Sequence, residues 1–104
     1  MVDGCNDLKL SGSGYTAREI AAASVCNARK AIAGLEDRFV ALDIGPSGKL
    51  LKPLGDLDFE DAVELFAETV RGGVSEGADL ILVETMSDAY ELKAAVLAAK
   101  ENST

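Results

Sequence analysis

Apolar residues recur at helical spacing in three parts of the chain. The first part opens at Tyr15 and Thr16, after a polar, glycine-rich start that ends in Ser11–Gly14 and is typical of a loop. The order Thr16-Ala17-Arg18-Glu19 fits a capping box, in which Thr and Glu satisfy backbone donors where a helix begins. We therefore expect a helix from there, with an inward stripe of Ala21, Val25, Ala28, Ile32 and Leu35.

Two further helices are predicted by the same spacing. The first spans residues 59–76 and is stopped by Gly77, with inward positions Phe59, Ala62, Val63, Phe66, Val70 and Val74. Asp56 or Asp58 is the expected cap of this helix. The last helix is capped by Ser87 or Asp88, and its expected inward positions are Leu92, Ala95, Val96 and Ala99.

Two short runs lack this spacing and are apolar at every position. Phe39–Leu42 precedes Asp43, and Leu80–Val83 precedes Glu84. A short run that is apolar on both sides is typical of a parallel strand buried on both faces. The order loop-α-β-α-β-α then predicts an α/β fold, with residues 59–76 as a right-handed crossover between two adjacent parallel strands.

The number of strands suggests an incomplete domain. The chain has 104 residues, whereas an eight-stranded parallel barrel typically takes about 250 residues. Two strands are also too few for a doubly wound sheet. We therefore expect residues 1–104 to be one segment of a larger α/β domain, or of an assembled one.

Composition and charge exclude several classes of function. Apolar residues make up 48% and charged residues 27%, and no apolar run approaches the length of a membrane span. Neither a secretory signal nor an oxidising compartment is indicated, so we expect a cytoplasmic protein. The net charge is −8, with 12 acidic and 3 basic side chains in residues 56–104. Nucleic acid and membrane partners are therefore not expected, and solvated helix faces account for the acidic half.

Several catalytic and metal sites are also excluded. The chain contains no His, so it cannot form a Ser-His-Asp or Cys-His nucleophile pair by itself. Cys5 and Cys26 are too few for a closed zinc site, and we interpret both as reduced bystanders. Gly48-Lys49 does not complete a phosphate-binding loop, because Asp43 and Leu50 occupy positions that require Gly and Ser or Thr.

The candidate site lies where the two strands end. Ligands of parallel α/β domains gather at the carboxyl ends of strands, and adjacent strands lie about 5 Å apart. Asp43 and Glu84 are therefore placed to face one pocket. The alternative is that each acid only caps a loop or meets a basic partner, since acids are common in turns.

Four stretches together resemble the homocysteine S-methyltransferase family, in its cobalamin-dependent branch. Asp43–Leu50 is similar to the loop after the third barrel strand, and Ala78–Asp88 to the fourth strand and its loop. Glu91–Lys100 is similar to the helix that follows, and Gly4–Leu10 to the stretch after the second strand. The resemblance covers about residues 4–101 and implies a segment of a TIM (β/α)8 barrel, with two parallel strands and three helices.

The resemblance implies a function for the complete barrel. The family transfers a methyl group to the homocysteine thiol, which a zinc ion held by three cysteines binds as thiolate, and the donor in this branch is methylcobalamin. Glu84 would hold the homocysteine amino group as a half-buried carboxylate, Asp43 would line the same mouth, and Gly45 would let the backbone approach substrate. Cys5 and Cys26 do not match the zinc ligands, so no cofactor is expected on this chain alone.

Two hypotheses follow from these residues. The first is an enzyme segment that binds homocysteine and is inactive without the remainder of the barrel. The second is a non-catalytic α/β module, left from a truncated barrel, that associates with itself through its open strand edges.

Overall fold

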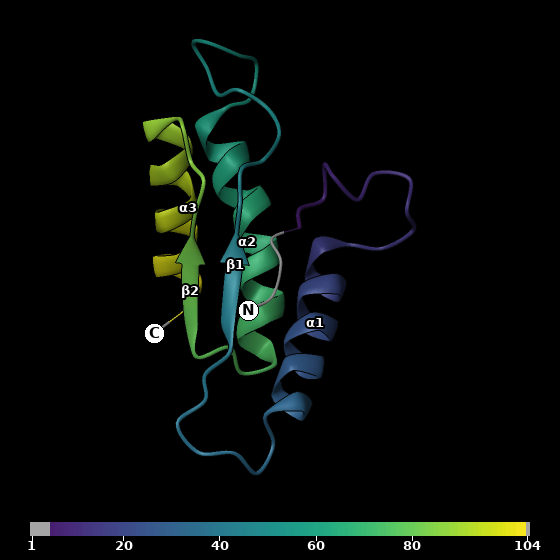
Figure 1. Cartoon of the computed structure of the whole chain (residues 1–104). Coiled ribbons are helices and arrows are strands. Elements are labelled where there is room, and N and C mark those ends of the chain that lie inside the picture. The colour runs from purple at the N-terminus through teal and green to yellow at the C-terminus, as the bar shows by residue number, and fades with distance from the viewer. Residues whose placement is uncertain (1–4, 104) are drawn as a thin grey trace.

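The computed structural model describes residues 5–103 and has the predicted element order (Figure 1). The elements are α1 (Ala17–Ala31), β1 (Ala41–Ile44), α2 (Phe59–Ser75), β2 (Leu80–Val83) and α3 (Ala89–Asn102). The part of the expected opening loop that falls on residues 1–4 lies outside the described residues, as does the last residue of the expected 1–104 segment. No described helix has the length and apolarity needed to cross a bilayer.

The start of α1 follows the capping prediction, but the end does not follow the apolar stripe. The Thr16 hydroxyl accepts a hydrogen bond from the Glu19 amide at 3.1 Å and donates one to the Glu19 carboxylate at 3.0 Å. The helix ends at Ala31, and Gly34 has a φ of 83°. Leu35 is therefore outside the helix and 59% exposed, so its predicted inward place is wrong.

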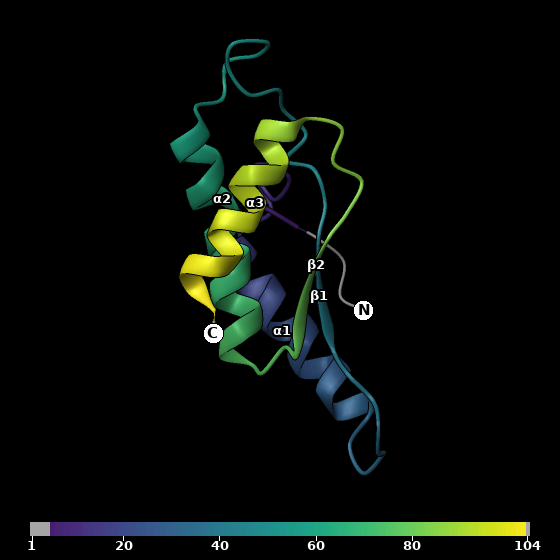
Figure 2. The ribbon, with the colours of Figure 1, turned by 90° about the vertical axis from the view of Figure 1, so that its left-hand side faces the viewer.

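The two strands are adjacent and parallel, as predicted. β1 pairs with β2 in the register Ala41↔Leu80 to Ile44↔Val83. The chain rises along β1, descends through α2 behind the sheet and rises again along β2, which is the right-handed crossover expected (Figures 1 and 2). Among residues 5–103 the sheet has these two strands only, so the structure is an α/β fold compatible with a barrel segment.

β1 begins two residues later than predicted. Phe39 is 70% exposed, and the buried positions of the strand are Leu42, Asp43 and Ile44. The shift follows from the partner strand. The ladder begins where Ala41 pairs with Leu80, and Asp79, just before Leu80, binds Val40, just before Ala41. The Asp79 carboxylate accepts a hydrogen bond from the Val40 amide at 2.8 Å, and Arg29 bonds the same oxygen at 2.7 Å.

All three helices lie on one face of the sheet, with α2 between α1 and α3 (Figures 1 and 2). Gly72 and Gly73 allow α2 to approach its neighbours closely. A Cβ at Gly72 would clash with the Arg18 carbonyl oxygen, and one at Gly73 would lie 2.5 Å from the Leu42 side chain. The core on this face is built from Ala21, Val25, Val40, Leu42, Ile44, Leu51, Ala62, Phe66, Ala67, Val70, Ala94, Ala95 and Ala98.

The opposite face of the sheet is open along β2. Ile81 and Val83 contact the core, whereas Leu80 is 46% and Leu82 is 40% exposed. The prediction of burial on both faces therefore holds for most of β1 and is wrong for β2. The reason is that no helix of the described residues covers this second face (Figure 2).

The inward face of α3 also differs from the prediction. Asp88 caps the helix by accepting a hydrogen bond from the Tyr90 amide at 2.9 Å, but Leu92 and Val96 are exposed. Ala95 is buried as expected, and Ala99 is only partly buried. Small residues allow α3 to lie close against α2, so the buried positions are Glu91, Ala94, Ala95 and Ala98.

Candidate functional site

The loops that follow the two strands leave the sheet side by side. The Glu84 amide donates a hydrogen bond to the Ile44 carbonyl at 3.0 Å, one step beyond the last strand pair. The segments beginning at Gly45 and Glu84 therefore share the carboxyl edge of the sheet. In parallel α/β proteins this edge is where ligands bind.

Asp43 lies within β1 rather than after it. Its neighbours Leu42 and Ile44 are in the cores under the helices, so strand alternation turns Asp43 to the opposite face, where its register partner is Leu82. The side chain is 3% exposed. Glu84 is two residues beyond Leu82, so alternation assigns both predicted acids to the same face of the sheet.

Glu84 follows β2 directly and is exposed, not half-buried as expected. Within residues 5–103 its carboxylate makes no hydrogen bond or ion pair. Asp88, not Glu84, caps α3. The interpretation of Glu84 as a loop cap therefore has no support in the contacts of the described residues, and the carboxylate is accessible to a ligand.

The turn after Glu84 has an unusual backbone. Thr85 adopts a φ of 58°, a left-handed conformation that is a marked outlier for a β-branched residue. Such conformations cost about 1–3 kcal/mol and cluster at ligand-binding turns. The left-handed φ of Thr85 sets the direction in which the chain continues after Glu84.

Gly45 is partly buried and does not require a left-handed φ. A Cβ added there would meet no atom within 4 Å. The space beside Gly45 is thus open, as the predicted close approach of a ligand requires.

A buried polar cluster behind this edge was not predicted from the sequence. Ser47 is 1% exposed and Glu91 is 4% exposed, and the Ser47 hydroxyl donates to Glu91 Oε2 at 2.6 Å. Asn6, which is 2% exposed, donates from Nδ2 to the Ser47 carbonyl at 3.4 Å. The available signal was the helical phase of Glu91, which falls in line with Ala94, Ala95 and Ala98.

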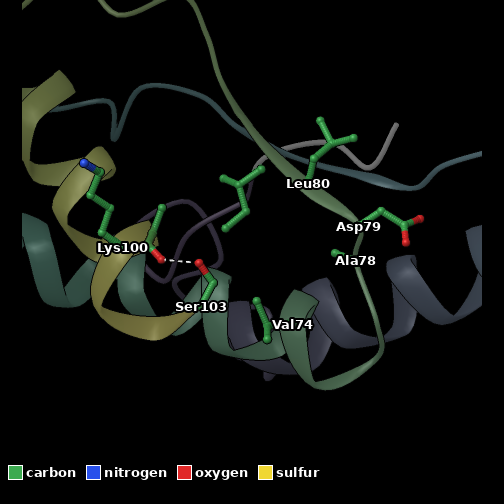
Figure 3. Close-up of a pocket in the computed structure, with 8 residues that line it drawn as sticks. Val74, Ala78, Asp79, Leu80, Lys100 and Ser103 are labelled. Carbon is green, nitrogen blue, oxygen red and sulfur yellow. Dashed lines mark hydrogen bonds between the residues drawn. The ribbon is translucent and has the colours of Figure 1, made fainter.

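A cavity of about 190 Å³ adjoins this cluster. It is lined by Pro46, Gly48, Lys49, Leu50, Ser87, Asp88 and Glu91. A larger hollow of about 370 Å³ lies at the other end of the sheet, where Val74, Asp79, Leu80, Lys100 and Ser103 line it (Figure 3). Since it is at the amino end of β2, it is distant from the edge where parallel sheets bind ligands.

Comparison with known protein families matches residues 4–104 to "Homocysteine S-methyltransferase". The chain belongs to the homocysteine S-methyltransferase family. The resemblance identified from the sequence motifs is thereby confirmed.

Two curated relatives of this family member are methionine synthases. The protein of Mycobacterium leprae is 37% identical and that of Mycobacterium tuberculosis 39% identical, each over 67 residues. These residues are 64% of this chain and 6% of each relative. This chain thus spans about 6% of the length of the curated proteins that it matches.

The two cysteines of this family member do not fit a zinc site. Cys26 lies on α1, whereas the Cys5 thiol donates to the Ala17 carbonyl at 3.9 Å. No three His, Cys, Asp or Glu side chains of residues 5–103 are grouped so that they would hold a metal ion. No chemical step through zinc is therefore assigned to these residues.

Proposed function

We propose that this chain is a segment of a methionine-synthase-type homocysteine S-methyltransferase and forms one wall of its homocysteine site. In this proposal residues 1–104 run from the end of the second strand to the helix after the fourth strand of a TIM (β/α)8 barrel. The family match over residues 4–104 and the parallel βαβ unit support this assignment. The open face of β2 would then face the barrel interior.

The observation that carries the proposal is the carboxylate of Glu84. It is exposed, makes no hydrogen bond or ion pair within residues 5–103, and lies at the carboxyl end of β2 beside Thr85 with its left-handed backbone. A carboxylate in this position accepts charge-assisted hydrogen bonds from the homocysteine ammonium group. Asp43 would line the same mouth, and the open space at Gly45 would admit the substrate close to the backbone.

The residues present decide which tasks of the proposed enzyme this segment performs. This segment binds and orients the amino acid end of homocysteine. Zinc and methylcobalamin, which the family resemblance implies for the complete enzyme, would be held by residues outside the segment. The chain alone is therefore proposed to be inactive in transferring the methyl group that converts homocysteine to methionine.

Titration of homocysteine into the complete barrel that contains this segment tests the proposal. Glu84→Gln keeps an acceptor oxygen but removes the charge, and we expect the dissociation constant to rise about tenfold or more, since one decade is ~1.4 kcal/mol. Zinc content should not change. Unchanged affinity with a lowered melting temperature would falsify the binding role and restore a purely structural one.

The open sheet supports a second candidate, a non-catalytic module that associates with itself. Leu80 and Leu82 are exposed on the face that lacks a helix layer, and unpaired strand edges favour pairing with another chain. Sedimentation of residues 1–104 as an oligomer that Leu80→Ser and Leu82→Ser dissociate would favour this candidate. A cooperative monomer at micromolar concentration would count against it.

The proposed location is the cytoplasm, and neither nucleic acid nor membrane is a proposed partner. The net charge of −8 supports the statement on partners, because phosphate backbones and anionic lipid surfaces repel an acidic chain.

A further inference from the structure

We infer that Ser47 and Glu91 are positioning residues, whose hydrogen bond holds the two loops of the homocysteine site at a fixed distance from each other. This inference rests on the proposed function. It adds to that function a pair of side chains that lie behind the substrate edge and need not touch the ligand.

The two residues come from different βα units. Ser47 follows β1 by three positions, in the loop that begins at Gly45, and Glu91 lies in the first turns of α3. Glu84, Thr85 and the α3 cap connect that helix to β2. The Ser47–Glu91 bond therefore joins the loop after β1 to the helix after β2, beyond the last backbone bond of the sheet.

The Ser47 hydroxyl lies closer to Glu91 than to the backbone carbonyl of its own loop. The Glu91 carboxylate oxygen is 2.6 Å from Oγ, whereas the Lys49 carbonyl is 3.1 Å away. Short O–H···O⁻ bonds of this kind are the stronger class of hydrogen bond. The Ser47 oxygen also accepts from the Lys49 amide at 3.2 Å, so the same hydroxyl shapes the loop locally.

Burial makes this bond costly to lose. Ser47 and Glu91 are 1% and 4% exposed, so neither replaces a missing partner readily with water. Asn6 supports the cluster from the other side, through its bond to the Ser47 carbonyl at 3.4 Å and its acceptance of the Lys9 amide at 2.9 Å. Removing one partner frees the Gly45–Ser47 loop to move relative to Glu84.

The test is a double-mutant cycle on homocysteine affinity in the complete barrel, with melting measured in parallel. Ser47→Ala and Glu91→Ala should each raise the homocysteine dissociation constant about tenfold, or ~1.4 kcal/mol. The double variant should be about as weak as either single variant, because both remove the same bond. Glu91→Gln, which keeps an acceptor, should bind within about threefold of the unsubstituted protein.

Val25→Ala is the control. Val25 is also buried, at 0% exposed, but it lies on α1 in a core cluster with Ala21, Val40 and Leu42, which contains no residue of α3 or of the loop after β1. It should lower the melting temperature and leave homocysteine affinity unchanged. If Glu91→Ala does not fold, Ser47→Ala, which removes a single oxygen atom, decides the question together with this control.

The outcomes separate this inference from the proposed function. If Glu84→Gln loses affinity while the Ser47 and Glu91 variants bind normally and only melt earlier, the positioning role is overturned and the function stands. Independent, multiplying losses from Ser47 and Glu91 also overturn it. Absence of homocysteine binding by the unsubstituted barrel overturns the function and the positioning role together.

Discussion

The two strands are similar in length and lie side by side, yet β1 is buried and β2 is half exposed. β2 has the more apolar sequence, Leu-Ile-Leu-Val, whereas β1 includes Asp43. Even so, Asp43 is 3% exposed and Leu82, its register partner, is 40% exposed. Burial in this chain is therefore decided by which neighbours a strand has, and the apolar sequence of β2 suits a face that is covered.

Substitutions on the two faces of the sheet should differ strongly in how far they lower the free energy of unfolding. Phe66 packs under the sheet at 1% exposed, and Phe66→Ala should lower the free energy of unfolding by about 3–5 kcal/mol. Leu82→Ala on the open face should cost less than about 1 kcal/mol in a monomer. Urea unfolding of residues 1–104 measures both. Equal losses would mean that the open face is covered, for instance by a second copy.

Two glycines differ in the room that the surrounding backbone leaves for a side chain. Gly72→Ala places a Cβ against the Arg18 carbonyl, which cannot move without displacing α1, and should cost about 1–3 kcal/mol. Gly45→Ala is the control, because its Cβ meets open space, and stability should stay within about 0.5 kcal/mol. In the complete barrel, Gly45→Ala should weaken homocysteine binding more than Gly72→Ala does. A strong loss of stability from Gly45→Ala would contradict the open space assigned to it.

The smallest expected effect is on the outer surface of α2. The Arg71 guanidinium donates to Glu64 at 2.7 Å and lowers the pKa of that carboxyl below its usual 4.5. The pair therefore stabilises the fold above about pH 4.5, and this contribution is lost as pH falls through the folded-state pKa. Because the pair is exposed, Glu64→Gln should shift the urea midpoint only slightly at pH 7, and the shift should shrink as the pH falls below 4.5. A shift that does not change with pH would argue against the ion pair.

Local signals in the sequence predicted much of this fold. The bounds of β2, the start of α2, the Thr16 and Asp88 caps and the stop before Gly77 all depend on adjacent residues, and all are found. The two-residue shift of β1 was not predictable, because it is set by Asp79 on another segment. The face of α3 was predicted from large apolar residues, whereas close packing on α2 selects alanines.

The candidate site was likewise predictable from the sequence only in part. Its place at the carboxyl edge follows from Asp43 and Glu84 standing at the ends of two apolar runs, together with the family resemblance. The helical phase of Glu91 signals its burial, but its bond to Ser47 joins residues 44 positions apart, so only the folded chain reveals that partner. The exposure of Glu84 likewise depends on what surrounds the strand end rather than on its own sequence.

The role of Glu84 is tested by measuring the affinity of two ligands for two forms of the complete barrel. Homocysteine and 4-mercaptobutyrate differ only in the amino group that Glu84 is proposed to hold. The unsubstituted protein should prefer homocysteine by about tenfold or more, and Glu84→Gln should remove most of that preference while binding 4-mercaptobutyrate as before. If Glu84→Gln weakens the binding of both ligands equally, or leaves the preference intact, Glu84 does not bind the ammonium group and this edge of the sheet is not the proposed homocysteine site.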